Sequence, residues 1–268
     1  MIIGDYHVHT PFCPHGTTDT LNAYVESALN KGFKEISFTE HAPLPLGFID
    51  PTPAKDSGLA QDKVARYIET MIDLKATYKN ELKINVGFEV DFIEGFESET
   101  RQFLDHYGPW IDDAILSVHM LKDPYGQYHC LDYSVASFGD ILRAFVSLEE
   151  VYAAYFKTVA LSLESDLGMY KPMRLGHITL VEKFKRQYPY DYSHKLKNQI
   201  TALLKDVKAK GYSLDLNTAG LFKPDCLTMY PNPVVFEEAK ALGISFKAGS
   251  DAHQSRDVGR AFDLLELS

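Results

Sequence analysis

Three segments of this chain share one pattern, in which an apolar helix-forming stretch ends at a glycine and a short strand-forming stretch follows. They lie at residues 28–39, 207–217 and 239–248. Lysine in the last turn of a helix and glycine just beyond it are helix stop signals. Helix and strand units repeated in this way are typical of an α/β fold built on a parallel sheet.

The same pattern, followed along the whole chain, predicts seven strands, which are placed at residues 2–6, 35–39, 84–88, 114–118, 173–176, 213–217 and 244–249. The predicted helices cover residues 21–31, 62–79, 98–106, 148–166, 194–210, a segment capped by Asn232 and a short segment at 259–267. The 268 residues contain no low-complexity tract or strong linker, which predicts a single domain over 1–268. Residues 43–58 and 123–139 are rich in turn formers and predict long loops of the kind that often bind ligands.

Six of the seven predicted strands end at side chains that can bind a metal ion. These side chains are His7, His9 and His15, then Glu40 and His41, then Glu89, His119, His177, and finally Asp251 and His253. The carboxyl ends of parallel strands in a barrel meet at one mouth. Residues separated by one position point to the same side of an extended chain, so His7 and His9 can reach one ion.

A single histidine at a strand end is more often a surface or core residue, and the prediction therefore depends on the whole set. His106, His129 and His194 fall in predicted helices or loops and are interpreted as structural. Cys13 is interpreted as a small buried residue, with a peripheral role at the metal site left open. Asn217 ends the sixth strand, where it is a poor metal ligand and a candidate substrate contact.

Charge and composition exclude several classes of function. The net charge of −10 and the pI of about 5.4 disfavour binding of the nucleic-acid backbone. Three scattered cysteines do not form a disulfide framework and indicate a reducing compartment. No signal peptide or membrane-spanning apolar run is visible, so the cytoplasm is the expected location, and the oligomeric state, a homo-oligomer included, is left open.

The ordered set of residues from His7 to His253 resembles the PHP (polymerase and histidinol phosphatase) superfamily, over residues 5 to about 260. The resemblance implies a distorted (β/α)7 TIM-like barrel with three divalent ions, zinc, iron or manganese, at the carboxyl ends of the strands. It assigns His7, His9, Glu89 and Asp251 to the first ion. It assigns a bridging Glu89, His119 and His177 to the second ion, and His15, His41 and His253 to the third.

Within this superfamily the chain is most similar to the members that hydrolyse L-histidinol phosphate to L-histidinol and phosphate in histidine biosynthesis. The shared features are the start His9-Thr-Pro-Phe-Cys-Pro-His15-Gly16, the segment 216–221 and Tyr230-Pro231. Relatives often carry a basic pair where this chain has Phe222-Lys223. The resemblance thus predicts a phosphoric monoester hydrolase acting through a metal-bound hydroxide, with Glu89, Asp251 and His253 as catalytic residues.

The substrate contacts predicted for this small phosphate ester are Arg174, Arg256, Lys223 and Asn217, although for each arginine a structural pairing is an equal alternative. Glu40 and Asp91 are candidates for contact with the cationic amine of the substrate. Two other functions stay open. One is a phosphoesterase that acts on nucleotides or other small phosphate esters, and the other is a metal-binding module without catalysis.

Overall fold

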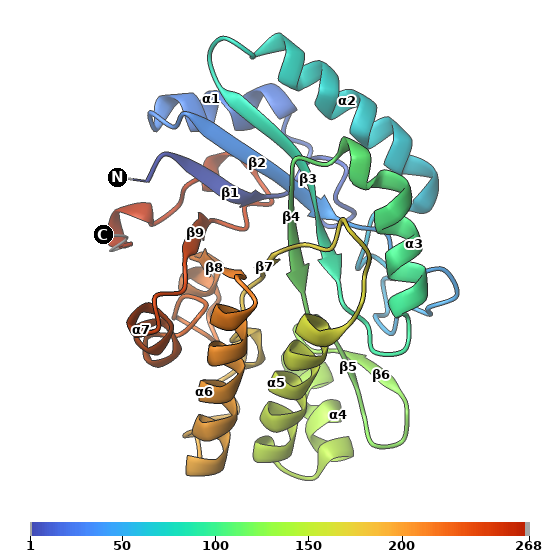
Figure 1. The fold of residues 1–268 in the computed structure, drawn as a ribbon, viewed down its shortest axis with the longest axis vertical. Helices are drawn as coiled ribbons and strands as arrows, with labels where there is room; N and C mark the ends of the chain where they lie inside the picture. The colour runs from blue at the N-terminus through green and yellow to red at the C-terminus, as the bar shows by residue number, and fades with distance from the viewer. Residues whose placement is uncertain (1, 266–268) are drawn as a thin grey trace.

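Seven parallel strands form one sheet in the computed structural model, which describes residues 2–265 (Figure 1). In their order across the sheet the strands are β1 (Gly4–Val8), β2 (Glu35–His41), β3 (Lys83–Asp91), β4 (Asp113–Ser117), β7 (Arg174–Leu175), β8 (Ser213–Asn217) and β9 (Phe246–Gly249). The chain beyond β9 returns to β1, where the Asp251 N–H donates to His7 O at 2.8 Å and the His9 N–H to Ala252 O at 2.9 Å. These bonds nearly close the sheet into the predicted (β/α)7 barrel.

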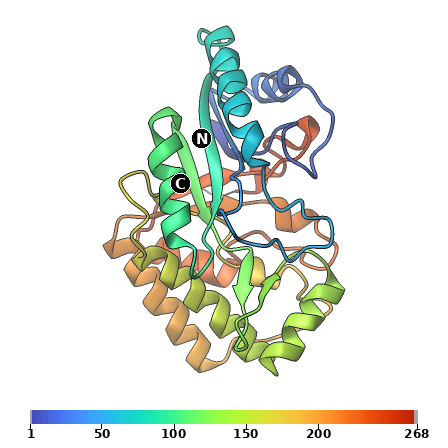
Figure 2. The same ribbon diagram turned by 90° about the vertical axis from the view of Figure 1, so that its right-hand side faces the viewer.

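Helices lie between most of the strands and cover the outside of the sheet (Figures 1 and 2). They are α1 (Leu21–Asn30), α2 (Val64–Thr77), α3 (Glu97–Tyr107), α4 (Val135–Phe145), α5 (Leu148–Glu164), α6 (His194–Ala209) and α7 (Pro233–Ala241). The predicted cap of α7 is present, since Asn232 Oδ1 accepts a hydrogen bond from the Val235 N–H at 2.9 Å. Ser147 and Ser193 cap α5 and α6 in the same way.

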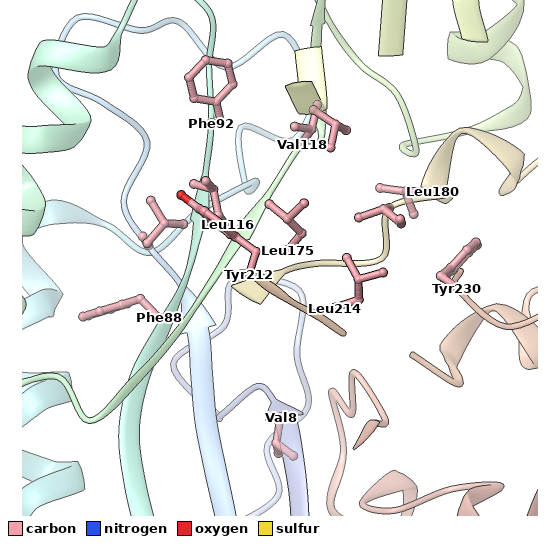
Figure 3. Close-up of a cluster of buried hydrophobic side chains, with 14 of the residues drawn as sticks. Val8, Phe88, Phe92, Leu116, Val118, Leu175, Leu180, Tyr212, Leu214 and Tyr230 are labelled. Atoms are coloured by element: carbon pink, nitrogen blue, oxygen red, sulfur yellow. The ribbon is translucent and has the colours of Figure 1, made fainter. Parts of the chain in front are cut away.

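Buried apolar side chains from neighbouring strands form part of the hydrophobic core of the protein (Figure 3). Leu116, Leu175 and Leu214 come from β4, β7 and β8 and are at most 2% exposed. Burial on this scale contributes roughly 1.5–3 kcal/mol for each large side chain. A packed interior of this kind fixes the strand ends relative to one another, and this determines where the ligand side chains stand.

The sequence-based prediction was wrong at two places in the described chain. Residues 123–139, expected to form a loop, contribute strand β6 (Tyr128–Cys130) and the start of helix α4, and β6 pairs antiparallel with β5 (Met120–Lys122). The helix expected at residues 259–267 is only a 3₁₀ turn at Phe262–Leu264, and residues 266–268 lie outside the described residues. Among residues 2–265, no helix combines the length and the apolar character that crossing a bilayer requires.

Candidate metal centre

The predicted ligands meet at the carboxyl ends of the barrel strands. His7 lies near the end of β1 and His9 follows that strand directly, and both side chains are fully buried. Glu89 lies near the end of β3. The Nε2 atoms of His7 and His9 are 3.5 and 3.6 Å from Glu89 Oε2. Asp251, in the turn after β9, places Oδ1 3.2 Å from His9 Nε2. Residues from both ends of the sequence are thus brought within one ion's reach.

Glu89 lies at the centre of the cluster. Its Oε2 atom is 3.1 Å from His41 Nδ1, and its Oε1 atom is 2.9 Å from His177 Nε2 and 3.8 Å from His119 Nε2. Ser117 Oγ donates a hydrogen bond to Oε1 at 2.6 Å and holds the carboxylate in place. Because the two oxygens face different histidines, Glu89 has the arrangement required of a carboxylate that bridges two ions.

Three groups of side chains place their ligand atoms within 4.8 Å of one another among the described residues. The groups are His7, His9 and Glu89, then Glu89, His119 and His177, and finally His9, Cys13, His41 and His253. His15 lies at the edge of the third group, since its ring centroid is 5.0 Å from those of His41 and His253. The His15 side chain is exposed, and its Nδ1–H donates to Asp56 O at 3.1 Å.

In most of these histidines, the ring nitrogen that points away from the cluster lies within hydrogen-bond distance of an acceptor oxygen. His7 Nδ1 is 2.7 Å from Asp215 Oδ2, and His119 Nδ1 is 2.7 Å from Asp91 Oδ1. His9 Nδ1 is 3.3 Å from Glu40 Oε1, while His253 Nδ1 is 3.0 Å from its neighbour's carbonyl oxygen, Asp251 O. An acceptor at Nδ1 keeps the proton there and leaves the Nε2 lone pair free for a metal ion.

The free ring nitrogens test whether metal ions fit this site. The Nε2 atoms of His7, His9, His41 and His253, together with Nδ1 of His177, are buried and have no hydrogen-bond partner among the described residues. Each unsatisfied buried polar group costs about 1–3 kcal/mol. Divalent ions bound between the four Nε2 atoms and the two carboxylates would satisfy those nitrogens, and imidazole with carboxylate is a ligand set that zinc, iron and manganese accept. The residues present therefore fit metal ions.

The electrostatics of the site also favour positive charge. Burial alone would lower the pKa of His9, but the Asp251 and Glu40 carboxylates outweigh it and raise this pKa to about 9. Burial likewise opposes protonation of His119, whose pKa is raised to about 10 by Asp91 and Glu89. Burial also opposes ionisation of Glu89, yet His7 and His119 hold its pKa well below the usual value. Divalent ions would displace the histidine protons and compensate the same carboxylates.

A cavity of about 560 Å³ opens above the cluster and is lined by residues of both charges. The described residues that line it include the metal-site side chains Glu89, His119 and His177, the cations Lys183, Lys223 and Arg260, and the acids Asp56, Asp132 and Asp257. Lys183 Nζ pairs with Asp132 Oδ2 at 2.8 Å, and Arg260 Nη1 pairs with Asp257 Oδ2 at 3.0 Å. The loop at residues 43–58, predicted from its prolines, contributes Thr52, Asp56 and Ser57 to the wall.

Of the four predicted substrate contacts, the structure places only Lys223 among the described residues that line this cavity. Arg174 begins β7 and therefore lies at the opposite end of the barrel, where its Nη2 donates to Tyr6 O and Asp113 Oδ2 at 2.9 Å each. Arg256 is exposed in a 3₁₀ turn outside the cavity wall. Asn217 is fully buried, and its Nδ2 donates to Asp215 Oδ2 at 3.0 Å and to Asp251 Oδ2 at 3.3 Å.

Several residues of the site were missed or given another role by the sequence reasoning. Asp215 was missed, although a buried acid at the centre of Ser213–Asn217 is itself a signal that a polar partner faces it. Glu40 contacts His9 and the Thr10 N–H rather than the cavity, while Asp91 both binds His119 and lines the cavity. Arg260 and Lys183 were missed because charged residues in loops and turns carry no periodic signal.

The sequence of this chain matches two known protein families. Residues 5–219 match the family described as PHP domain, and residues 230–266 match the family described as PHP-associated. The histidinol-phosphatase of Bacillus subtilis is 48% identical over 259 residues, which cover 97% of this chain and 96% of that protein.

Two solved structures resemble nearly the whole chain. One comes from Listeria monocytogenes and is described as that of a candidate histidinol phosphatase, hisK; its TM-score is 0.93 at 37% identity, and the match covers 97% of this chain and 99% of that one. The other is the histidinol phosphate phosphatase of Lactococcus lactis complexed with zinc, L-histidinol and phosphate. Its TM-score is 0.66 at 22% identity, with 94% of this chain and 86% of that one covered. The second supports the fold alone.

Proposed function

This chain belongs to the PHP domain family, and we propose that it is a phosphoric monoester hydrolase that converts L-histidinol phosphate to L-histidinol and phosphate. The observation that carries the proposal is the group of buried histidine nitrogens near Glu89 and Asp251 that have no hydrogen-bond partner among the described residues, at the base of a cavity that holds charged groups of both signs. The near full-length similarity to the Bacillus subtilis histidinol-phosphatase supports the choice of substrate.

We assign the ions to three positions by combining the family resemblance with the clusters. His7, His9, Glu89 and Asp251 would hold the first ion, and Glu89, His119 and His177 the second. His41 and His253, with His15 at the edge, would hold the third. Bound divalent ions would supply the positive charge that attracts a phosphate dianion and would activate water for attack on phosphorus.

The protonation states of Asp251 and His253 suit them to holding cations. Burial opposes ionisation of Asp251, but His7 and the other nearby histidines keep its pKa well below the usual value, so at neutral pH it accepts rather than donates protons. Burial and the neighbouring His9 hold the pKa of His253 well below its usual value, and its ring is therefore neutral. Since Nδ1–H donates to Asp251 O, Nε2 faces the site as a lone pair. We therefore assign Glu89, Asp251 and His253 to holding ions.

The cavity wall matches a substrate that carries a phosphate and an amine. Among the cations that line the cavity, Arg260 is the best candidate for binding the phosphate. Its Nε atom is buried without a hydrogen-bond partner among the described residues, and only its Nη1 is paired with Asp257. The guanidinium lies on the face of Phe222, with Cζ 3.8 Å from the ring centroid, and this contact fixes its plane. A fixed guanidinium with free donors suits phosphate oxygens.

Replacing Arg260 with glutamine should raise KM for histidinol phosphate by about 10- to 100-fold, because a hydrogen bond to a charged group contributes roughly 1.5–3 kcal/mol. The matched variant is Arg256→Gln, which removes an exposed arginine outside the cavity wall and should leave KM unchanged. Steady-state kinetics of both variants gives the comparison. If only Arg256→Gln raised KM, Arg256 and not Arg260 would bind the phosphate, as the sequence predicted.

The proposed reaction is tested by phosphate release from three substrates, each with and without a chelator. These are histidinol phosphate, a nucleoside monophosphate and a generic aryl phosphate. We expect the first to be hydrolysed with the highest kcat/KM and all release to stop when metal is removed. A higher kcat/KM for the nucleotide would show that the substrate is a nucleotide and not histidinol phosphate. If none of the three substrates released phosphate in a metal-dependent way, the protein would bind metal without this activity.

A further inference from the structure

The third group of ligand atoms contains a residue beyond the nine that the family resemblance assigns to metal. Cys13 Sγ lies within 4.8 Å of the ligand nitrogens of His9, His41 and His253, and the Cys13 residue is only 6% exposed. The Nε2 atoms of these three histidines are buried and without a hydrogen-bond partner among the described residues. Cys13 therefore lies beside histidines whose Nε2 atoms have no hydrogen-bond partner among the described residues, which is the sign that a cation belongs there.

A tight loop holds Cys13 in this position. The Cys13 N–H donates to Thr10 O at 3.0 Å, and the Gly16 N–H donates to Cys13 O at 3.1 Å. Thr10 is itself fixed, because its N–H donates to Glu40 Oε2 at 2.9 Å. At Gly16 a Cβ would come within 3.2 Å of both Cys13 Cβ and Thr10 O, so the turn is closely packed. Cys13 is thus fixed by the same chain segment that carries His9 and His15.

We propose that Cys13 is a ligand of the ion held by His41 and His253. The inference rests on the metal-binding part of the proposed function and not on the identity of the substrate. On binding, the S–H bond gives its proton to solvent and the sulfur gives a lone pair to the ion, with no change of oxidation state. A thiolate is a softer ligand than imidazole or carboxylate, and it shifts the preference of this position towards zinc and away from manganese.

The alternative role for Cys13 is that of a small apolar side chain, for which this chain offers a matched control. Cys226 is also buried, at 2% exposed, and its thiol lies 3.6 Å from Thr228 O. It is in none of the groups of metal-capable side chains among the described residues. A serine at either position removes one buried thiol, but only Cys13→Ser removes a thiol that lies within 4.8 Å of ligand nitrogens of three histidines.

The test uses the full chain loaded with cobalt(II), because sulfur bound to cobalt gives a charge-transfer absorption in the near ultraviolet. Wild type and Cys226→Ser should both show this band, and Cys13→Ser should lack it while keeping the visible bands of cobalt bound to the remaining ligands. Persistence of the band in Cys13→Ser would overturn the proposal. Its absence from cobalt-loaded wild type would do so as well.

A second measurement needs no variant and holds even if Cys13→Ser fails to fold. X-ray absorption at the zinc edge of wild-type protein should include a sulfur neighbour at about 2.3 Å, the usual zinc–thiolate distance. A zinc environment of nitrogen and oxygen alone would overturn the proposal. Histidinol phosphate hydrolysis is assayed on the same samples. A sulfur ligand without hydrolysis would defeat the substrate assignment and leave the ligand assignment standing.

Discussion

Glu89→Gln should lose bound metal and phosphatase activity together. The substitution keeps the size of the side chain but removes the charge that faces His7, His9, His41, His119 and His177. Loss of the shared carboxylate weakens two ion positions at once, and their charge stabilisation is worth several kcal/mol, so kcat/KM should fall by about 1,000-fold or more. Metal analysis of the purified variant and steady-state kinetics measure the two effects.

The matched control is Glu69→Gln, the same chemical change on the exposed face of α2. It should keep both metal and turnover. The thermal midpoint of each variant, measured with a chelator present, separates loss of metal from loss of fold. If Glu89→Gln kept its full metal content and its turnover, Glu89 would not bridge the ions.

Asp215→Asn should lower metal affinity by about 10- to 100-fold, the usual effect of removing the partner of a ligating histidine. Asp215 is not among the described residues that line the cavity, but its Oδ2 atom is 2.7 Å from His7 Nδ1 and holds the proton on that nitrogen. An asparagine can instead turn an N–H towards Nδ1. This would move the imidazole proton to Nε2, where it would block the metal. Competition with a chromophoric chelator measures the affinity.

Two controls separate this effect from a general loss of stability. Asp206→Asn makes the same change at an exposed site on α6 and should leave metal affinity unchanged. The free energy of unfolding of the metal-free protein shows how much of the Asp215 effect is structural. Equal metal affinity for wild type and Asp215→Asn would show that the His7 tautomer does not depend on this carboxylate.

The sequence predicted the main strands and their ligand ends because both carry a local signal. Apolar runs bounded by glycine locate the strands, and a histidine or carboxylate directly after a strand has only one end of the barrel to occupy. The parallel order of the strands then gathers residues as distant as His7 and Asp251. The gathering of these side chains at one end of the barrel could therefore be predicted from the sequence.

The parts that the sequence did not predict depend on contacts between distant segments. Residues 135–145 contain Gly139 and follow a segment rich in turn residues, yet they form α4 because Phe138, Ile141 and Phe145 are buried against the rest of the protein. Arg174 is the first residue of a strand of only two residues, and only its pairing with Asp113 shows that it lies at the other end of the barrel. Similarly, nothing local reveals that Arg260 stacks on Phe222.

Metal content of freshly purified wild-type protein, measured by elemental mass spectrometry against protein concentration, is the most direct test of the central claim that the strand ends form one multinuclear centre. The ligand set predicts close to three divalent ions per chain, retained through gel filtration and removed by a strong chelator together with activity. Fewer than one ion per chain, in protein that hydrolyses histidinol phosphate equally well with chelator present, would contradict it.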